Sequence, residues 1–78
     1  MIERELNEIA QEIKKDWGAK VNYGAKPYLD AMTQLYSIDD MYINDTADSI
    51  VRYFLSNARS WRGEVAKRVK KELNEMIK

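Results

Sequence analysis

Apolar residues recur along this chain three and four positions apart in several separate stretches, which is the spacing of amphipathic helices. The first stretch predicts a helix over residues 1–17. Its apolar stripe consists of Ile2, Leu6, Ile9, Ala10, Ile13 and Trp17. Gly18 follows at the position where a residue with positive φ commonly ends a helix.

A second helix is expected after a connection over residues 18–26. Pro27 suits its first position, because the missing N–H would have no intrahelical partner there. The helix should run for about ten residues, the usual length in globular proteins. Its apolar residues are Tyr28, Leu29, Met32, Leu35 and Tyr36. The connection before it is either an ordinary loop or a mobile flap over a site.

An acidic, turn-rich segment separates this helix from the third. Ser37 and Asp40 have the spacing of a weak capping box, which predicts one helical turn around residues 39–42. Asp45 or Thr46 is expected to cap the third helix. A calcium loop is rejected, because the glycine and the terminal glutamate of the EF-hand pattern are missing.

The third helix carries the broadest apolar face and should be the core helix. That face consists of Ala47, Ile50, Val51, Phe54, Leu55 and Ala58. Ser60 is a natural N-cap for a fourth helix from Trp61 to about Ile77, in which Glu64 and Arg68 would form an i,i+4 ion pair. Gly63 in its first turn is expected to let another backbone or a ligand approach.

Short connections between such helices predict an all-α fold, a small bundle of three to four helices. The 78 residues form a single domain, with residues 26–78 as the helical core and residues 1–17 as an amphipathic helix and candidate oligomerisation element. Cysteine and histidine are both absent, which removes disulfides and the usual zinc ligand. Self-association remains as a stabiliser for so small a chain, so we expect a homo-oligomer that completes the bundle.

Charge is balanced overall but unevenly distributed. Residues 1–48 have a net charge of −5 and residues 49–78 a net charge of +5. Such a chain can fold its acidic half onto its basic half or pair head to tail with a neighbour. Zero net charge disfavours specific nucleic-acid binding. No long apolar run and no signal-peptide pattern is present, so no membrane association and a cytoplasmic location are expected.

The composition argues against an enzyme. Without histidine and cysteine, catalysis by a nucleophile and a histidine base is excluded, and no motif supports a lysine or carboxylate alternative. The three glycines are isolated, so no glycine-rich loop cradles a phosphate. We therefore expect no catalytic residue, no cofactor and no metal site.

The candidate chemistry lies where the third helix meets the fourth. Arg59, Ser60, Trp61 and Arg62 combine two guanidinium groups, a hydroxyl and an indole beside a helix N-terminus. Arginine forks and helix N-termini suit phosphate oxygens, and an aromatic face suits a nucleobase. The alternative is purely structural, with Trp61 as a core anchor, Ser60 as a cap and the arginines paired with the acidic half.

Three more residues complete the predicted site if the second helix packs alongside. Lys26 could join the arginines on phosphates, Tyr28 could stack on a base in place of Trp61, and Asn57 could contribute hydrogen bonds.

Two segments resemble a family of small proteins encoded by tailed bacteriophages and prophages. They are KPYLDAM at residues 26–32 and YFLSN at residues 53–57 followed by WRG at residues 61–63. The similarity covers about residues 24–75. The resemblance implies a setting in the cytoplasm of an infected host cell, and carries over no catalytic residue.

Small accessory phage proteins commonly disarm the host, so the resemblance suggests a counter-defence role. The first hypothesis is a non-enzymatic oligomer that sequesters a cyclic nucleotide or ADP-ribose-type immune signal between protomers. The alternative is an inhibitor or adaptor that binds a host defence or replication protein through a helical face. Arginine and tryptophan are favoured in both kinds of site.

Overall fold

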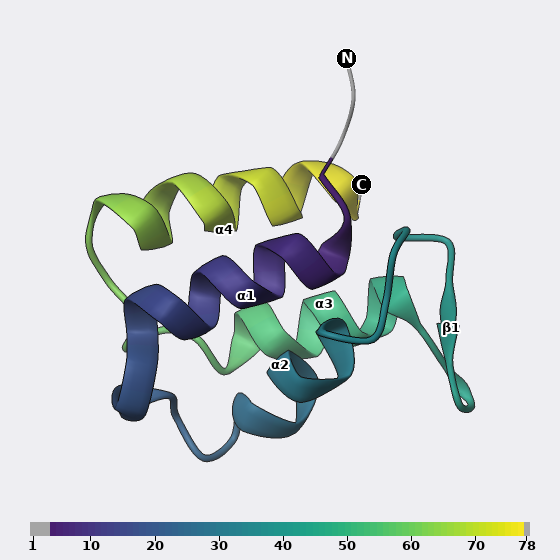
Figure 1. The fold of residues 1–78 in the computed structure, drawn as a ribbon, viewed down its shortest axis with the longest axis horizontal. Coiled ribbons are helices and arrows are strands. Elements are labelled where there is room, and N and C mark those ends of the chain that lie inside the picture. Colours follow the sequence, from purple (N-terminus) through teal and green to yellow (C-terminus); the bar gives the residue numbers. More distant parts are fainter. Residues whose placement is uncertain (1–3, 78) are drawn as a thin grey trace.

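A computed structural model describes residues 4–77, and it is rich in helix. The α-helices are α1 (Leu6–Trp17), α2 (Lys26–Met32), α3 (Ala47–Ser56) and α4 (Glu64–Met76), with a short 3-10 helix η1 (Gly18–Lys20) after α1. Between α2 and α3 the strands β1 (Met41–Tyr42) and β2 (Asp45–Thr46) form an antiparallel hairpin (Figure 1). The prediction of a helical bundle is therefore confirmed only as a helix-rich fold, because the hairpin adds a small sheet.

Helix α1 ends at Trp17 as predicted, but Arg4 and Glu5, which the prediction placed in the helix, lie before its start. It begins at Leu6, where the side chains of Glu5 and Glu8 form a reciprocal capping box. Ile2, which continues the stripe in the sequence, lies outside the described residues. Gly18 has φ +62°, which confirms its predicted role at the helix end.

Helix α2 is shorter than predicted. It begins at Lys26, so Pro27 is its second residue, and it ends at Met32. The chain leaves the helix because its next carbonyl groups serve α1: Leu35 and Tyr36 accept hydrogen bonds from the first backbone N–H groups of α1, each at 2.9 Å. These amides have no partner within their own helix. Tertiary pairing thus replaces the last turn of the expected helix.

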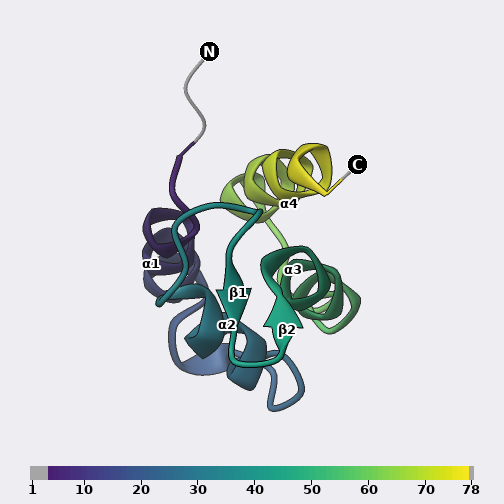
Figure 2. The same cartoon turned by 90° about the vertical axis from the view of Figure 1, so that its right-hand side faces the viewer.

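The expected helical turn around residues 39–42 is wrong, because this segment forms a turn and then β1. The Asp40 carboxylate accepts hydrogen bonds from the backbone N–H groups of Tyr36 and Ser37, at 2.9 and 3.0 Å. These bonds hold the pKa of Asp40 below its ordinary value. The hairpin that follows pairs Met41 with Thr46, and it stands at the N-terminal end of α3 (Figures 1 and 2).

Of the two candidates, Asp45 and Thr46, it is Thr46 that caps α3. Thr46 Oγ1 accepts a hydrogen bond from the backbone N–H of Ser49, and Asp48 lies in the first turn as the helix dipole prefers. The residues buried on this helix are Ala47, Ile50, Val51 and Phe54.

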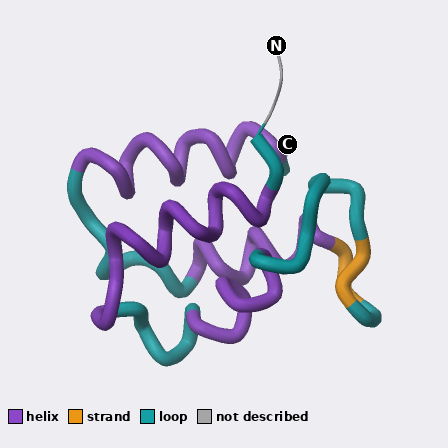
Figure 3. Tube along the Cα trace, in the orientation of Figure 1, coloured by secondary structure: helices purple, strands orange, loops and turns teal. Residues whose placement is uncertain are grey.

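Helix α4 begins at Glu64, three residues later than predicted. Its N-cap is Gly63, with φ +113° and ψ −178°, so Ser60 is not a helix cap and Trp61 lies in the connection before the helix. A backbone in this region is almost restricted to glycine. The connection from α3 is consequently a loop of several residues (Figure 3).

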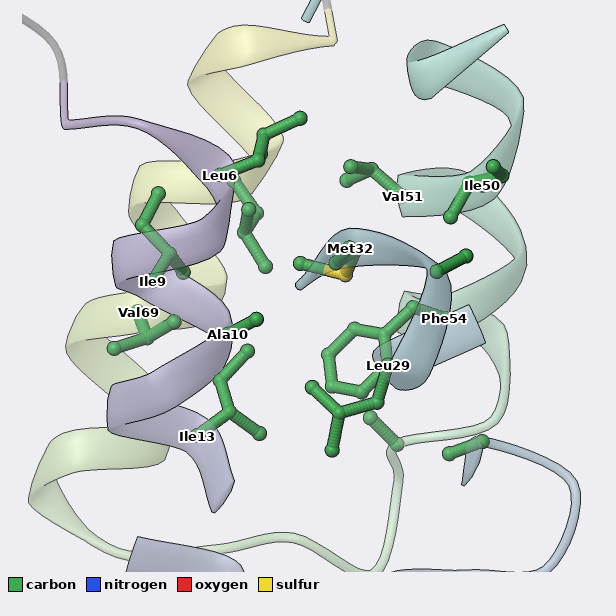
Figure 4. Close-up of a cluster of buried hydrophobic side chains, with 14 of the residues drawn as sticks. Leu6, Ile9, Ala10, Ile13, Leu29, Met32, Ile50, Val51, Phe54 and Val69 are labelled. Atoms are coloured by element: carbon green, nitrogen blue, oxygen red, sulfur yellow. The ribbon is translucent and has the colours of Figure 1, made fainter. Parts of the chain in front are cut away.

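All four α-helices contribute to one hydrophobic core. Helix α2 packs against α3, and α1 packs against both α2 and α4. Figure 4 shows how side chains of α1 and α4 meet those of α2 and α3 in this core. Its completely buried large side chains include Leu6, Ile9, Ile13, Met32, Val51, Phe54, Val69 and Leu73. The apolar face of α1 is therefore used within the chain.

Ion pairs join α1 to α4 on the outside of this core. Arg4 pairs with Glu12 at 2.8 Å and with Glu72 at 2.6 Å, and Arg68 also pairs with Glu12. Arg68 thus reaches across to α1 instead of forming the predicted pair with Glu64. No helix within residues 4–77 is both long and apolar enough to cross a membrane.

Candidate functional site

The connection between α3 and α4 is anchored in the core by Trp61. Its indole is 2% exposed and stacks on Trp17, with ring centroids 5.7 Å apart and an angle of 15° between the planes. Phe54 packs edge-on against the Trp61 indole, with ring centroids 6.4 Å apart. These contacts agree with the structural interpretation of Trp61 as a core anchor, since a base could stack on this ring only if the core repacked.

Polar contacts fix the same indole in place. The indole Nε1–H donates a hydrogen bond to the Asp16 carboxylate at 2.8 Å. The backbone carbonyl of Trp61 accepts a hydrogen bond from the Lys70 ammonium at 2.6 Å. Lys70 also lies 5.8 Å from the centre of the ring, within cation–π range. Trp61 thereby ties the connection to α1 on one side and to α4 on the other.

The polar residues of the junction, by contrast, point to solvent. Arg59, Ser60 and Arg62 are exposed. Within residues 4–77, neither guanidinium group forms an ion pair. The alternative in which these arginines pair with the acidic half of the same chain is therefore not realised in the part that the structure describes.

Two hollows lie on either side of Arg62. The α4-side hollow, about 400 Å³, is lined by Trp61, Arg62, Gly63, Glu64, Ala66, Lys67 and Lys70. The α1-side hollow, about 370 Å³, is lined by Asp16, Trp17, Lys20, Ser60, Trp61 and Arg62. Because Arg62 lines both, it can bridge groups bound in the two hollows.

The α4-side hollow is the more electropositive of the two. Arg62, Lys67 and Lys70 line it together with a single acid, Glu64. Burial, and then the charge of Arg62, hold the pKa of Lys70 below its ordinary value. The N-terminus of α4 opens here without a side-chain cap, so its first N–H groups add positive potential.

Lys26, Tyr28 and Asn57 line neither hollow. Lys26 pairs with Asp30 at 3.2 Å, and Tyr28 packs against Tyr53 with ring centroids 5.4 Å apart. The structure thus brings Ser60, Trp61 and Arg62 together at the hollows. The other predicted residues, Arg59, Lys26, Tyr28 and Asn57, line neither hollow.

Asn57 has a local structural role. Its side-chain amide donates a hydrogen bond to the Tyr53 carbonyl at 2.8 Å. Its Oδ1 lies close to Gly24: a Cβ atom added to that glycine would be only 2.7 Å from this oxygen. Gly24 therefore allows the α1–α2 connection to pack closely against the end of α3. This contact leaves little room for a mobile flap at that point.

Sequence reasoning missed Lys20, Lys67 and Lys70 as lining residues. The two lysines of α4 are three positions apart and follow Gly63 by four and seven residues, so they share the face at the helix start. That signal is visible once Gly63, and not Ser60, is recognised as the N-cap. Lys20 approaches from η1 and carries no local signal of this kind.

The side chains of this arrangement are of the kinds that suit anions. The exposed groups are arginine, lysine, a hydroxyl and helix N–H groups, which bind oxygen-rich anions. Within the described chain, no group of three or more acidic side chains lies close enough to hold a metal ion.

No protein-family model, curated protein or solved structure matches this chain. The bacteriophage resemblance therefore stays a prediction.

Proposed function

We propose that this chain is a non-enzymatic binding protein that holds a phosphate-bearing, nucleotide-type ligand across the two hollows. The observation that carries the proposal is the convergence of Arg62, Lys67 and Lys70 on the uncapped N-terminus of α4. Charge-assisted hydrogen bonds from these groups are the strongest available contacts to phosphate oxygens.

A nucleotide also has a polar body, and the adjoining α1-side hollow can receive it. The Ser60 hydroxyl can donate hydrogen bonds to sugar and base groups or accept them, and the Asp16 carboxylate can accept them. Lys20 adds a further cation. The stacking role predicted for Trp61 is not needed, because recognition here is polar. A cyclic dinucleotide or an ADP-ribose isomer has the required combination of phosphate and hydroxyl groups.

In the bacteriophage setting that the sequence resembles, such binding would sequester an immune signal of the host without cleaving it. The unmodified ligand should then be recoverable from the complex after denaturation.

Calorimetric titration with a panel of cyclic dinucleotides and cyclic ADP-ribose isomers tests the proposal. Arg62→Ala should reduce affinity by roughly tenfold to a hundredfold, the value of one charge-assisted contact. Lys71→Ala is the matched control, because Lys71 is exposed on the same helix but lines neither hollow. Flat titrations across the panel with folded protein would rule the proposal out.

The second candidate function is an inhibitor or adaptor that binds a host protein. It is favoured by the aromatic surface near α3, where Tyr53 is 52% exposed and packs against Tyr28. Tyrosine is enriched among the residues that dominate protein interfaces. Under this alternative, a host protein co-purifies with the wild type and with Lys15→Ala but is lost from Tyr53→Ala.

A further inference from the structure

The tip of the β1–β2 hairpin combines two unfavourable features at one residue. Ile43 has φ +57°, and it is the only residue other than glycine with a positive φ within residues 4–77. Two-residue hairpin turns normally place glycine, asparagine or aspartate at such positions, and a β-branched residue there is an outlier. The backbone of this turn is therefore strained by its side chain.

That side chain is also left in water. Ile43 is 80% exposed, and Met41 on the adjoining strand is 60% exposed. Glycine at this position would relieve the strain and remove the exposed apolar surface together. Isoleucine at this position adds both backbone strain and exposed apolar surface, which indicates that its side chain contacts another molecule.

The surroundings of the tip define the charge of its partner. Asp45 follows the turn directly, and Asp39 precedes β1; both are exposed. Neither carboxylate has an ion-pair partner in the described part of the chain. A complementary surface must accordingly offer an apolar socket with basic residues around it.

The chain itself carries such a socket in the α4-side hollow. Its lining includes Trp61 and Ala66, which are buried apolar residues, and Arg62, Lys67 and Lys70, which supply the positive charge. Its volume of about 400 Å³ can receive an aliphatic side chain. In charge, the hollow complements the hairpin tip.

The two surfaces lie at opposite ends of the molecule. Along its long axis, the hairpin stands at one end and the start of α4 at the other (Figures 1 and 3). A hairpin can therefore reach this hollow only in a second copy.

We propose that the hairpin of one copy docks into the α4-side hollow of a second copy, with Ile43 in the socket and Asp45 against its basic residues. The contact is heterologous, so repeated docking closes a ring or extends a filament. It goes beyond the proposed ligand function and forms without any ligand. Where both exist, a phosphate ligand and the hairpin compete for Arg62 and Lys67.

Sedimentation velocity of the ligand-free protein tests the docking. From about 10 µM to about 1 mM, the range of weak association, the sedimentation coefficient of the wild type should rise with concentration. Ile43→Gly should weaken association at least about tenfold, as loss of an interface anchor does, while raising the melting temperature. Tyr23→Ala is the matched control, because Tyr23 is 85% exposed but lies between η1 and α2.

A charge exchange tests which residues meet. Asp45→Lys alone places a lysine opposite Lys67, and Lys67→Asp alone places an aspartate opposite Asp45, so each single variant sets two like charges against each other. Each variant should associate at least about tenfold more weakly than the wild type, and an equimolar mixture should recover association. Circular dichroism confirms that each variant is folded.

Three results would overturn the docking proposal: a wild type that stays monomeric over the whole range, an Ile43→Gly variant that associates like the wild type, or a mixture that recovers nothing. Because no ligand is present, failure of the proposed ligand function leaves each of these outcomes unchanged.

Discussion

At the scale of single residues, Gly63 determines where the last helix begins. Its φ of +113° and ψ of −178° turn the chain from the buried Trp61 into the first turn of α4. An ideal Cβ at this position would meet nothing within 4 Å, so the requirement for glycine is one of backbone conformation and not of space.

Gly63→Ala should therefore destabilise the protein by about 1–3 kcal/mol, the cost of forcing a side chain into this region of φ and ψ. Urea unfolding followed by far-UV circular dichroism measures the change. Ser60→Ala in the same connection is the control, and should change the free energy of unfolding by less than about 0.5 kcal/mol because the side chain is exposed. Equal stability of the two variants would contradict the conformational argument.

Trp61 shows that residue type alone does not assign a role. An indole beside two arginines suits a nucleotide site, but here its ring is stacked on Trp17 and its N–H is bonded to Asp16. The neighbouring guanidinium groups remain exposed, so one connection holds both a core anchor and a candidate ligand surface.

At the scale of elements, α3 depends on its N-terminal cap. Thr46 is the last residue of β2 and the cap of α3 at once, so its hydroxyl joins the hairpin to the helix at Ser49. Loss of this hydroxyl leaves a backbone N–H at the helix start without its partner.

Thr46→Ala is expected to lower the free energy of unfolding by about 1 kcal/mol, the usual contribution of an N-cap. Urea unfolding gives the loss of stability, and amide hydrogen exchange should show reduced protection at Ser49. The control is Ser56→Ala at the other end of α3, where the hydroxyl only bonds back to the Arg52 carbonyl. Such a bond contributes little to helix stability. If Ser56→Ala proved the costlier change, the cap would not be the reason.

At the scale of the whole molecule, the acidic and basic halves are partly neutralised across the α1–α4 contact. Glu12, from the acidic half, binds Arg68 from the basic half and also Arg4. Its pKa is held below the ordinary value, first by the hydrogen bond from Arg68 and then by that from Arg4. Within the described chain, Asp39 and Asp45 near the hairpin and Arg62 and Lys67 at the start of α4 are among the charged residues without an ion-pair partner.

This network predicts a specific loss of stability in acid. A carboxylate whose pKa is lowered on folding stabilises the fold above its unfolded pKa, about 4.5 for Glu12, and that contribution disappears as the pH falls through the folded value. The pKa of Asp30 is also lowered, chiefly by the hydrogen bond from Lys14, so its contribution to stability is likewise lost in acid. With no histidine, the side chains give little reason for a change between pH 5 and 8.

Glu12→Gln should reduce the free energy of unfolding by about 1 kcal/mol at pH 7, as expected for a partly exposed ion-pair network, and the difference from wild type should shrink as the pH falls below the ordinary glutamate pKa. Urea unfolding at pH 7 and at successively lower pH measures it. Glu75→Gln is the control and should match the wild type at each pH, because Glu75 is exposed and forms no ion pair within residues 4–77. A difference that persisted at low pH would show that Glu12 acts through packing and not through charge.

The sequence by itself determined the approximate positions of the helices and most of the core. Apolar spacing and cap residues placed the end of α1 and the start of α3 at their observed residues, because helical periodicity is a local property of the chain. It also identified Thr46 as a candidate cap and the α3–α4 connection as the richest in binding chemistry.

The tertiary structure alone decided which of these residues act together. Helix α2 ends early because carbonyls beyond it cap α1, and α4 begins late because Trp61 enters the core and Gly63 turns the chain after it. The start of α4 in turn brings Lys67 and Lys70 beside Arg62, while Lys26 and Tyr28 remain elsewhere. These arrangements depend on contacts between residues distant in sequence, which no local pattern of apolar and polar positions records.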